Sequence, residues 1–143
     1  MSGKFLFHCD DRSVADPGDE LAIQVRLRSR MRMLAPGVRL VATPNAGKRT
    51  AWAAMKAKAE GMAAGFPDLN VIWSNGQGVN AVPGIAFLEL KDRNGSLSAA
   101  QEDWLNFLHQ AGFPCGCFRS VDTAIAFLRA AGAPFVVGQG VAA

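Results

Sequence analysis

Residues 67–91 read PDLNVIWSNGQGVNAVPGIAFLELK, and this stretch decides the predicted fold. Its apolar segment 68–73 is rich in Val, Ile and Trp, which favour strands. A Gly- and Asn-rich loop is expected over residues 74–83. Residues 85–91 then form the clearest strand in the sequence. Two strands joined by such a loop predict a β-hairpin in the middle of the chain.

The charged residues of this hairpin suggest a chemistry. Successive strand side chains point to opposite faces, so Glu89 and Lys91 share one face while Leu90 turns toward the core. If the strands pair, Asp68 lies beside Glu89. Two adjacent carboxylates repel each other, and a divalent cation that prefers oxygen ligands, Mg²⁺ or Mn²⁺, relieves the repulsion. With a neighbouring lysine, these are the components of phosphodiester hydrolysis.

Working outward, capping signals and composition predict further elements on both sides of the hairpin. Helices are expected over residues 17–34, 50–60, 98–111 and 120–130, and strands over residues 38–42 and 113–119. The segment 17–34 also alternates with a period of two, but Asp16-Pro17 supplies a cap followed by proline and favours a helix. This order predicts an α/β fold with a mixed central sheet flanked by helices.

Length and composition bound the remaining possibilities. The 143 residues suit one core, and a chain that is 50% hydrophobic and 19% charged is neither disordered nor collagen-like. No apolar run reaches the roughly 18 residues of a membrane helix, and the N-terminus lacks a signal-peptide pattern, so a cytoplasmic location is expected. Residues 1–15 are expected to be an arm or short extra element, 16–132 the domain, and 133–143 a tail.

Cysteine and glycine patterns argue against two other classes of site. Cys9, Cys115 and Cys117 are an odd number without zinc-finger spacing, so buried thiols in a reducing compartment are expected. Residues 46–50 lack two positions of a phosphate-binding loop, and residues 76–78 lack the third glycine of a dinucleotide site. No nucleotide cofactor is expected.

Positive charge is concentrated in one quarter of the chain. No acidic residue lies between Glu20 and Glu60, an interval with nine basic residues: Arg26, Arg28, Arg30, Arg32, Arg39, Lys48, Arg49, Lys56 and Lys58. Such a concentration favours a phosphate backbone as the partner, and the alternative is a solvated helix face. The tryptophans, Trp52, Trp73 and Trp104, are expected in the core or an interface rather than under stacked bases.

A longer series of matches resembles a known family. The matching strings are PNAGKR at 44–49, KAEGMAAGFPDL at 58–69, FLELK at 87–91, GSLSAAQ at 95–101 and a strand over 112–119. In this order, over about residues 19–130, the chain resembles the VRR-NUC branch of the PD-(D/E)xK nucleases. The resemblance implies a single restriction-endonuclease-like domain over residues 16–132.

The resemblance also implies roles for individual residues. Asp68 and Glu89 would bind Mg²⁺ or Mn²⁺ with the backbone carbonyl of Leu90, and Glu20 is a further candidate ligand whose alternative role is to interact with its helix N-terminus. The implied catalytic residues are Asp68, Glu89, Lys91, Gln101 and Glu20. The residues expected to face DNA are Asn45, Lys48 and Arg49 in a loop, and Arg26, Arg30, Lys56 and Lys58 from the basic interval.

The implied activity is metal-dependent cleavage of branched DNA. Stand-alone viral (phage) members of the family resemble Holliday-junction resolvases that work as homodimers, which points to DNA recombination and repair. Apolar residues near the termini are candidates for the dimer interface: Phe5, Leu6, Phe7, Phe135, Val136 and Val137. Two alternatives stay open. One is a family member that processes flaps, nicks or ends, and the other is a DNA-binding module without catalysis.

Overall fold

The computed structural model describes residues 5–44 and 50–136, which form a five-stranded mixed sheet with helices on both faces. The strands are β1 His8–Cys9, β2 Arg39–Ala42, β3 Leu69–Asn75, β4 Val82–Leu90 and β5 Cys115–Phe118, in the order β1-β5-β4-β3-β2. β2, β3 and β4 pair antiparallel, whereas β5 runs parallel to both β4 and β1. The sheet is therefore mixed, as the sequence predicts.

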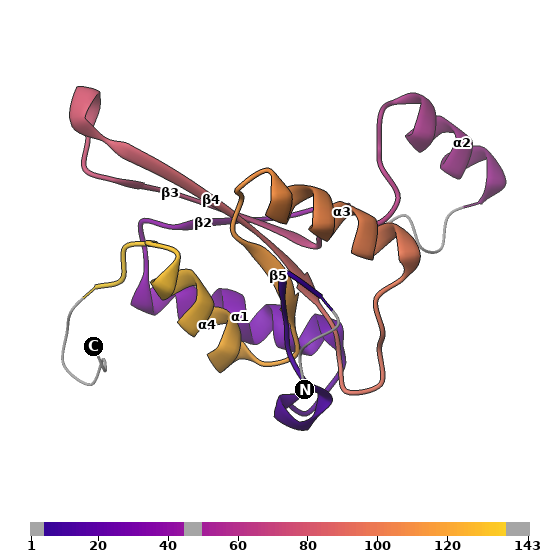
Figure 1. Ribbon diagram of the computed structural model, residues 1–143, viewed down its shortest axis with the longest axis horizontal. Coiled ribbons are helices and arrows are strands. Elements are labelled where there is room, and N and C mark those ends of the chain that lie inside the picture. The colour runs from indigo at the N-terminus through magenta and orange to yellow at the C-terminus, as the bar shows by residue number, and fades with distance from the viewer. Residues whose placement is uncertain (1–4, 45–49, 137–143) are drawn as a thin grey trace.

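Four α-helices surround this sheet in the described part of the chain (Figure 1). They are α1 Glu20–Leu34, α2 Ala51–Ala59, α3 Ala99–Gln110 and α4 Val121–Ala130, beside two short 3-10 helices, η1 Arg12–Val14 and η2 Gly78–Asn80. α1 and α4 pack on one face and build the larger core, with Ile23, Leu27 and Leu128 fully buried. α3 covers the other face with a smaller cluster around Leu105 and Phe87. None of the described helices is both long and apolar enough to cross a bilayer.

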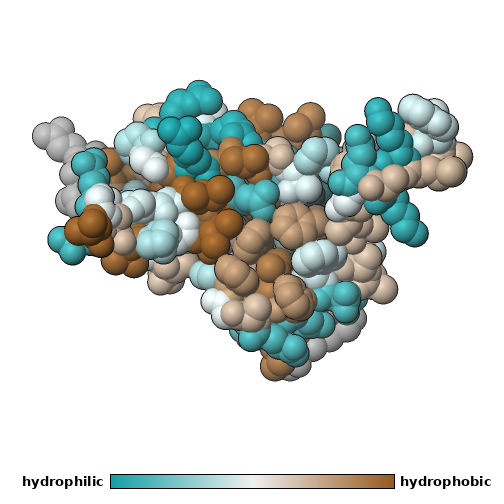
Figure 2. All heavy atoms as spheres, turned by 90° about the horizontal axis from the view of Figure 1, so that it is seen from above, coloured by the Kyte–Doolittle hydropathy of each residue, from teal (hydrophilic) through white to brown (hydrophobic). Residues whose placement is uncertain are grey.

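α2 differs from the other helices because it stands off from the sheet. Figures 1 and 2 show it projecting from one end of the molecule, with hydrophilic and weakly hydrophobic side chains side by side on its surface. Trp52 on this helix is 70% exposed, whereas Trp73 lies in the main core as expected. In the chain, α2 lies between β2 and β3. In space it stands beside the sheet and does not form a layer on it (Figure 1).

The predicted hairpin is present, but its strands are longer than expected. β3 and β4 pair from Leu69↔Leu88 to Asn75↔Val82, so residues 74–75 and 82–83 at the two ends of the predicted loop are strand, and η2 lies at the tip. Gly76 turns the chain with a φ of +83°, a conformation that side chains disfavour. Gly84 lets the Trp73 ring lie directly on the strand, since a Cβ there would stand 2.2 Å from the ring. The hairpin extends beyond the helices (Figure 1).

The start of α1 corrects the prediction from Asp16-Pro17. The N-cap is Asp19, whose carboxylate accepts a hydrogen bond from the Ala22 N–H at 2.9 Å. Gly18 has a φ of +95°, which interrupts the helical path before Asp19. Asp16 is used elsewhere, because its carboxylate accepts from the Val121 N–H at the start of α4. The cap prediction failed because the choice between two nearby aspartates depends on a contact with a distant helix.

The segment before α1 adds an edge strand that sequence periodicity did not predict. β1 pairs with β5 in parallel, with His8↔Gly116 and Cys9↔Cys117 in register. The buried Asp10 carboxylate follows β1 and accepts hydrogen bonds from the Arg119 N–H and the Thr123 hydroxyl. This segment therefore ties the N-terminal part of the chain to β5 and α4.

We expect His8→Gln to flatten the dependence of stability on pH. The hydrogen bond from the ring of His8 to Asp10, at 2.6 Å, raises the pKa of His8 above its usual 6.5, against the opposing effect of burial. The folded state thus holds this proton more tightly than the unfolded state. The stabilisation is complete below pH 6.5 and is lost as the pH rises through the folded pKa. Urea titrations across this range should show a steeper alkaline loss for the native protein, and equal slopes would contradict the assignment.

Candidate functional site

A cleft of about 1000 Å³ lies between α2, α3 and the strand ends that carry the predicted hairpin residues. Its walls bring together side chains that are far apart in the sequence. The predicted site residues that line it are Glu20, Lys58, Asp68, Glu89, Lys91 and Gln101. Segments 43–44 and 61–66 complete the lining together with Ala54, Ala57 and Trp104. The cleft therefore gathers all five candidate catalytic side chains in one place.

Asp68 and Glu89 face each other at the base of the β3–β4 hairpin. The pairing Leu69↔Leu88 sets Asp68 level with Glu89, and the Asp68 carboxylate accepts a hydrogen bond from the Leu90 N–H at 2.9 Å. Glu89 is 1% exposed. Its Oε2 accepts from the side-chain amide of Gln101 at 3.0 Å, but its Oε1 is buried without a hydrogen-bond partner.

This environment strongly disfavours a charge on Glu89. Burial is the largest cause, followed by the adjacent charge of Asp68, and together they raise the pKa of Glu89 to about 9. The opposing effect of Lys91, whose Nζ lies 3.8 Å from Glu89 Oε2, is smaller. Burial also raises the pKa of Glu20, with Lys91 opposing it. A buried carboxyl with a strongly raised pKa in a cleft is typical of a functional group, and here it needs a positive charge to ionise at neutral pH.

The donor set fits a hard divalent cation. The unpartnered Oε1 of Glu89 supplies a free oxygen, and the Asp68 carboxylate accepts only one hydrogen bond, from Leu90 N, among those that the structure records. Mg²⁺ binds through one or two carboxylates and keeps several waters. Among the described residues no three His, Cys, Asp or Glu side chains are grouped closely enough to hold a metal by themselves. The fit therefore rests on two carboxylates, a backbone carbonyl and water.

Gln101 is placed by the start of α3. Ser98 caps the helix, and Gln101 completes a capping box by accepting a hydrogen bond from the Ser98 N–H at 2.8 Å. With its amide oxygen held in this way, the amide nitrogen points to Glu89. One side chain thus satisfies a helix terminus and orients a candidate metal ligand.

A buried arginine that sequence reasoning missed holds the loop between Lys91 and α3. Arg119 is 5% exposed, and its guanidinium donates hydrogen bonds to the backbone carbonyls of Asp92, at 2.5 Å, and Gly95, at 2.8 Å. It also donates to the Asp10 carbonyl at 3.2 Å. A signal was available, since an arginine directly follows the apolar strand 115–118, where burial is expected.

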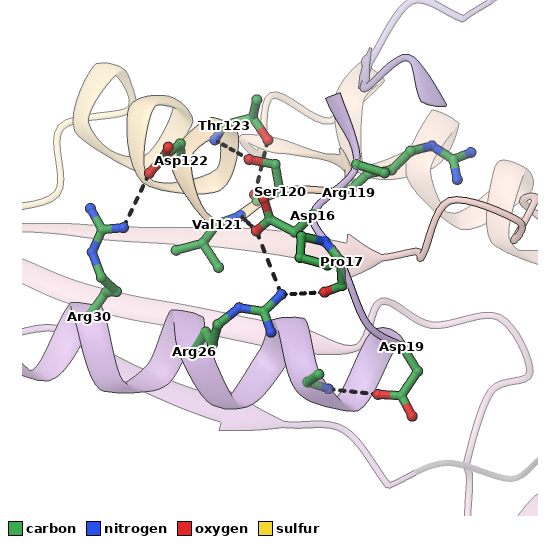
Figure 3. Close-up of polar contacts among 12 residues, drawn as sticks. Asp16, Pro17, Asp19, Arg26, Arg30, Arg119, Ser120, Val121, Asp122 and Thr123 are labelled. Carbon is green, nitrogen blue, oxygen red and sulfur yellow. Dashed lines mark hydrogen bonds and ion pairs between the residues drawn. The ribbon is translucent and has the colours of Figure 1, made fainter. Parts of the chain in front are cut away.

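The structure divides the predicted DNA-facing residues into three groups. Lys58 lines the cleft, and Lys56 lies 5.6 Å over the exposed Trp52 ring. Arg26 donates to the Pro17 carbonyl and lies 3.9 Å from Asp16, while Arg30 pairs with Asp122 at 3.2 Å (Figure 3). These two arginines do not line the cleft. Asn45, Lys48 and Arg49 lie outside the described residues.

Comparison with known proteins identifies the family and the fold of the chain. The model of the VRR-NUC domain family matches residues 23–122. A solved structure described as a VRR_NUC domain protein superposes with a TM-score of 0.59 at 19% identity, covering 82% of this chain and 90% of that one. At that identity the superposition shows a shared fold alone, which is restriction-endonuclease-like. No curated protein matches the chain.

Proposed function

The chain belongs to the VRR-NUC family of nuclease domains, and from this premise we propose that it is a metal-dependent endonuclease that cuts branched DNA. The observation that carries the proposal is the pair of carboxylates, one with an unpartnered oxygen, beside a lysine in a single cleft. Restriction-endonuclease-like folds are scaffolds on which the site, not the fold, determines the reaction. The groups in this cleft are those that a metal-assisted phosphodiester hydrolysis would use.

Each side chain has a distinct task in this proposal. Mg²⁺ or Mn²⁺ would be held by Asp68, Glu89 and the Leu90 carbonyl. When bound, such an ion lowers the pKa of a water molecule and stabilises the negative charge of the phosphate. Lys91 is 8% exposed and lies within 3.8 Å of Glu89, so its ammonium can donate to the attacking water or to a phosphate oxygen. Gln101 is a positioning residue, because it acts on the orientation of Glu89. Glu20 lines the same cleft, with Lys91 and Asp68 as its charged neighbours, and is the further candidate ligand.

For the DNA structure we propose four-way junctions, cut by a homodimer that presents two active sites to two strands. The apolar residues proposed for the interface have different environments. Phe7 is buried in the core beside α3, Phe5 stacks on it, and Phe135 packs against the main core. Leu6 is 76% exposed and Val136 is 43% exposed, and these two remain candidates; Val137 lies outside the described residues. If light scattering at micromolar concentration gives the mass of a monomer, the proposed dimer is contradicted.

The test is cleavage of labelled four-way junction, flap, nicked and linear duplex DNA with Mg²⁺, with Mn²⁺ and with EDTA. We expect metal-dependent nicks on opposite arms of the junction and an intact linear duplex. Cleavage of flaps, nicks or ends instead would support the nuclease activity but contradict the proposal that the protein resolves four-way junctions. Tight binding without cleavage under either metal would favour a DNA-binding module without catalysis.

Lys58→Gln is expected to weaken binding to every DNA structure by a similar factor. Lys58 is the basic residue that both lines the cleft and sits on the projecting helix α2, so it suits contact with a phosphate near the cut. Loss of one phosphate contact should lower the slope of log affinity against log salt by about one. Fluorescence anisotropy at several salt concentrations measures it. Lys58→Arg is the matched control and should retain the native slope, whereas an unchanged slope for Lys58→Gln would place the residue away from DNA.

The same assay tests Arg26 and Arg30. Their contacts with Asp16 and Asp122 compete with phosphate, yet their side chains are 43% and 50% exposed. A role in DNA binding predicts that the double variant Arg26→Gln/Arg30→Gln also has a lower salt slope. A native slope with reduced stability would assign both residues to packing α1 against α4.

A further inference from the structure

The cleft carries an aromatic wall that hydrolysis of a phosphodiester does not require. Phe66 and Trp104 both line it, with ring centroids 4.9 Å apart and ring planes at 80°. Both side chains are half-buried, so part of each ring faces the cleft. Met62 adds a flexible apolar side chain to the same lining. A polyanion alone would be better served by polar and basic groups.

This wall lies directly beside the candidate catalytic groups. Trp104 follows Gln101 by one turn of α3, so the two project from the same side of the helix. Gln101 contacts Glu89 at 3.0 Å, and Phe66 is two residues before Asp68. A nucleoside bonded to a phosphate at Asp68 and Glu89 therefore falls next to these rings.

Apart from Lys58 and Met62, α2 and the segment after it line the cleft with small side chains, and the cleft is wide enough to admit a base. α2 contributes Ala54, Ala57 and Lys58, and the segment after it contributes Gly61 and Ala63. Gly65 closes the floor against α3, where a Cβ would stand 2.5 Å from the Ala100 backbone carbon. The volume of about 1000 Å³ is at the upper end of the range for pockets that enclose whole small ligands, about 300–1000 Å³.

Base stacking determines which DNA can use such a wall. In a duplex each base has both of its faces covered by its neighbours, so no face is free for a protein ring. An unpaired or unstacked nucleotide exposes a face, and stacking on aromatic side chains is the usual way in which proteins bind it. Lys58 in the same cleft supplies positive charge for the adjoining backbone.

We propose that this cleft binds an unpaired nucleobase next to the scissile phosphate, stacked on Trp104 with Phe66 behind it. The substrate class is then DNA with an unstacked nucleotide at the cut, as at a branch point or a flap, in preference to continuous duplex. Trp104 and Phe66 are specificity residues in this scheme. The inference rests on the proposed nuclease function, since it names which part of the DNA enters the site. Trp104 also packs against the smaller core cluster, as the sequence predicted, and base stacking would be a second role for the part of its ring that lines the cleft.

The experiment is a cycle that combines deletion of one base with substitution of Trp104. Native protein is mixed, in EDTA, with a flap DNA or with versions carrying an abasic spacer at successive positions near the branch. We expect one spacer position to weaken binding by about 5- to 150-fold, the range for loss of one stacked base. In Trp104→Leu the same spacer should weaken binding only slightly. Trp104→Phe should recover part of the native preference for the DNA without the spacer. A purely structural role would weaken binding to both DNAs equally.

Two further variants distinguish loss of base binding from loss of folding. Phe66→Leu tests the second ring independently and should reduce the same preference. Phe113→Leu is the matched control, because Phe113 is 39% exposed and lies outside the lining of the cleft. In this variant the abasic spacer should weaken binding as much as it does in the native protein. The proposal is overturned if no spacer weakens native binding, or if the penalty is equal in Trp104→Leu and native protein. Cleavage with Mg²⁺ is scored separately, so failure to cut any DNA would count against the proposed function and not against base binding.

Discussion

Glu89→Gln is expected to abolish DNA cleavage and, at the same time, to stabilise the metal-free protein. Cleavage should fall by at least about 10²-fold, as when one preorganised charge-stabilising group is removed from an active site. The amide retains a carbonyl oxygen for Gln101 and adds an N–H that can donate to Asp68, so the site should keep its shape. DNA binding without metal should be retained.

The gain in stability follows from the raised pKa. In the unfolded chain Glu89 ionises near its usual 4.5, but in the folded protein burial and Asp68 raise the pKa to about 9. Between these values the folded state must hold a proton that the unfolded state releases, and stability falls as the pH rises. At pH 7 the cost is on the order of 3 kcal/mol, which a neutral glutamine avoids. The advantage of Glu89→Gln should therefore grow from pH 5 to pH 9.

Thermal unfolding with and without Mg²⁺ or Mn²⁺ measures both effects. Native protein should gain Tm on addition of metal, and Glu89→Gln should start higher and gain nothing. Glu60→Gln is the matched control, since Glu60 is exposed and does not line the cleft, and it should behave as native in both respects. Normal cleavage by Glu89→Gln would refute the site, and a pH-independent difference in stability would mean that Glu89 is ionised in the metal-free fold.

Arg119→Met is expected to lower the free energy of unfolding by about 3–5 kcal/mol, because each polar group left without a partner in a buried site costs about 1–3 kcal/mol. The substitution leaves the carbonyls of Asp10, Asp92 and Gly95 without their donor. Two of these carbonyls belong to the loop that joins Lys91 to α3. We therefore also expect cleavage to fall further than DNA binding, because the loop sets the relative position of Lys91 and Gln101.

Urea unfolding at neutral pH measures the change in stability. Arg119→Lys should recover only a part, because a single ammonium cannot reproduce the two donor positions of the guanidinium, Nη1 on the loop carbonyls and Nε on the Asp10 carbonyl. Arg39→Met serves as the control: this arginine is exposed on the edge strand β2, and its replacement should change stability by less than about 0.5 kcal/mol. A loss below 1 kcal/mol for Arg119→Met would show that water replaces the guanidinium.

Much of the fold was predictable because its signals are local. The alternation around Glu89 and Lys91 predicted β4, and the spacing of Ser98 and Gln101 predicted the start of α3. By contrast, β1 is two residues long and pairs with a strand more than a hundred residues away, so it has no periodicity of its own. The longer hairpin was missed because glycine and asparagine are common in loops, while here they lie at a tip and an exposed strand end.

By itself, then, the sequence determined the mixed α/β class, the hairpin, the family resemblance and the side chains proposed for catalysis, since each depends on residue types at short spacing. Only the tertiary structure decided how those side chains behave. The burial that raises the pKa of Glu89, the unpartnered oxygen beside Asp68, the ion pairs of Arg26 and Arg30 and the aromatic wall of the cleft all arise between distant segments. Desolvation and the choice of polar partner depend on which atoms surround a group, and those neighbours come together only when the chain folds.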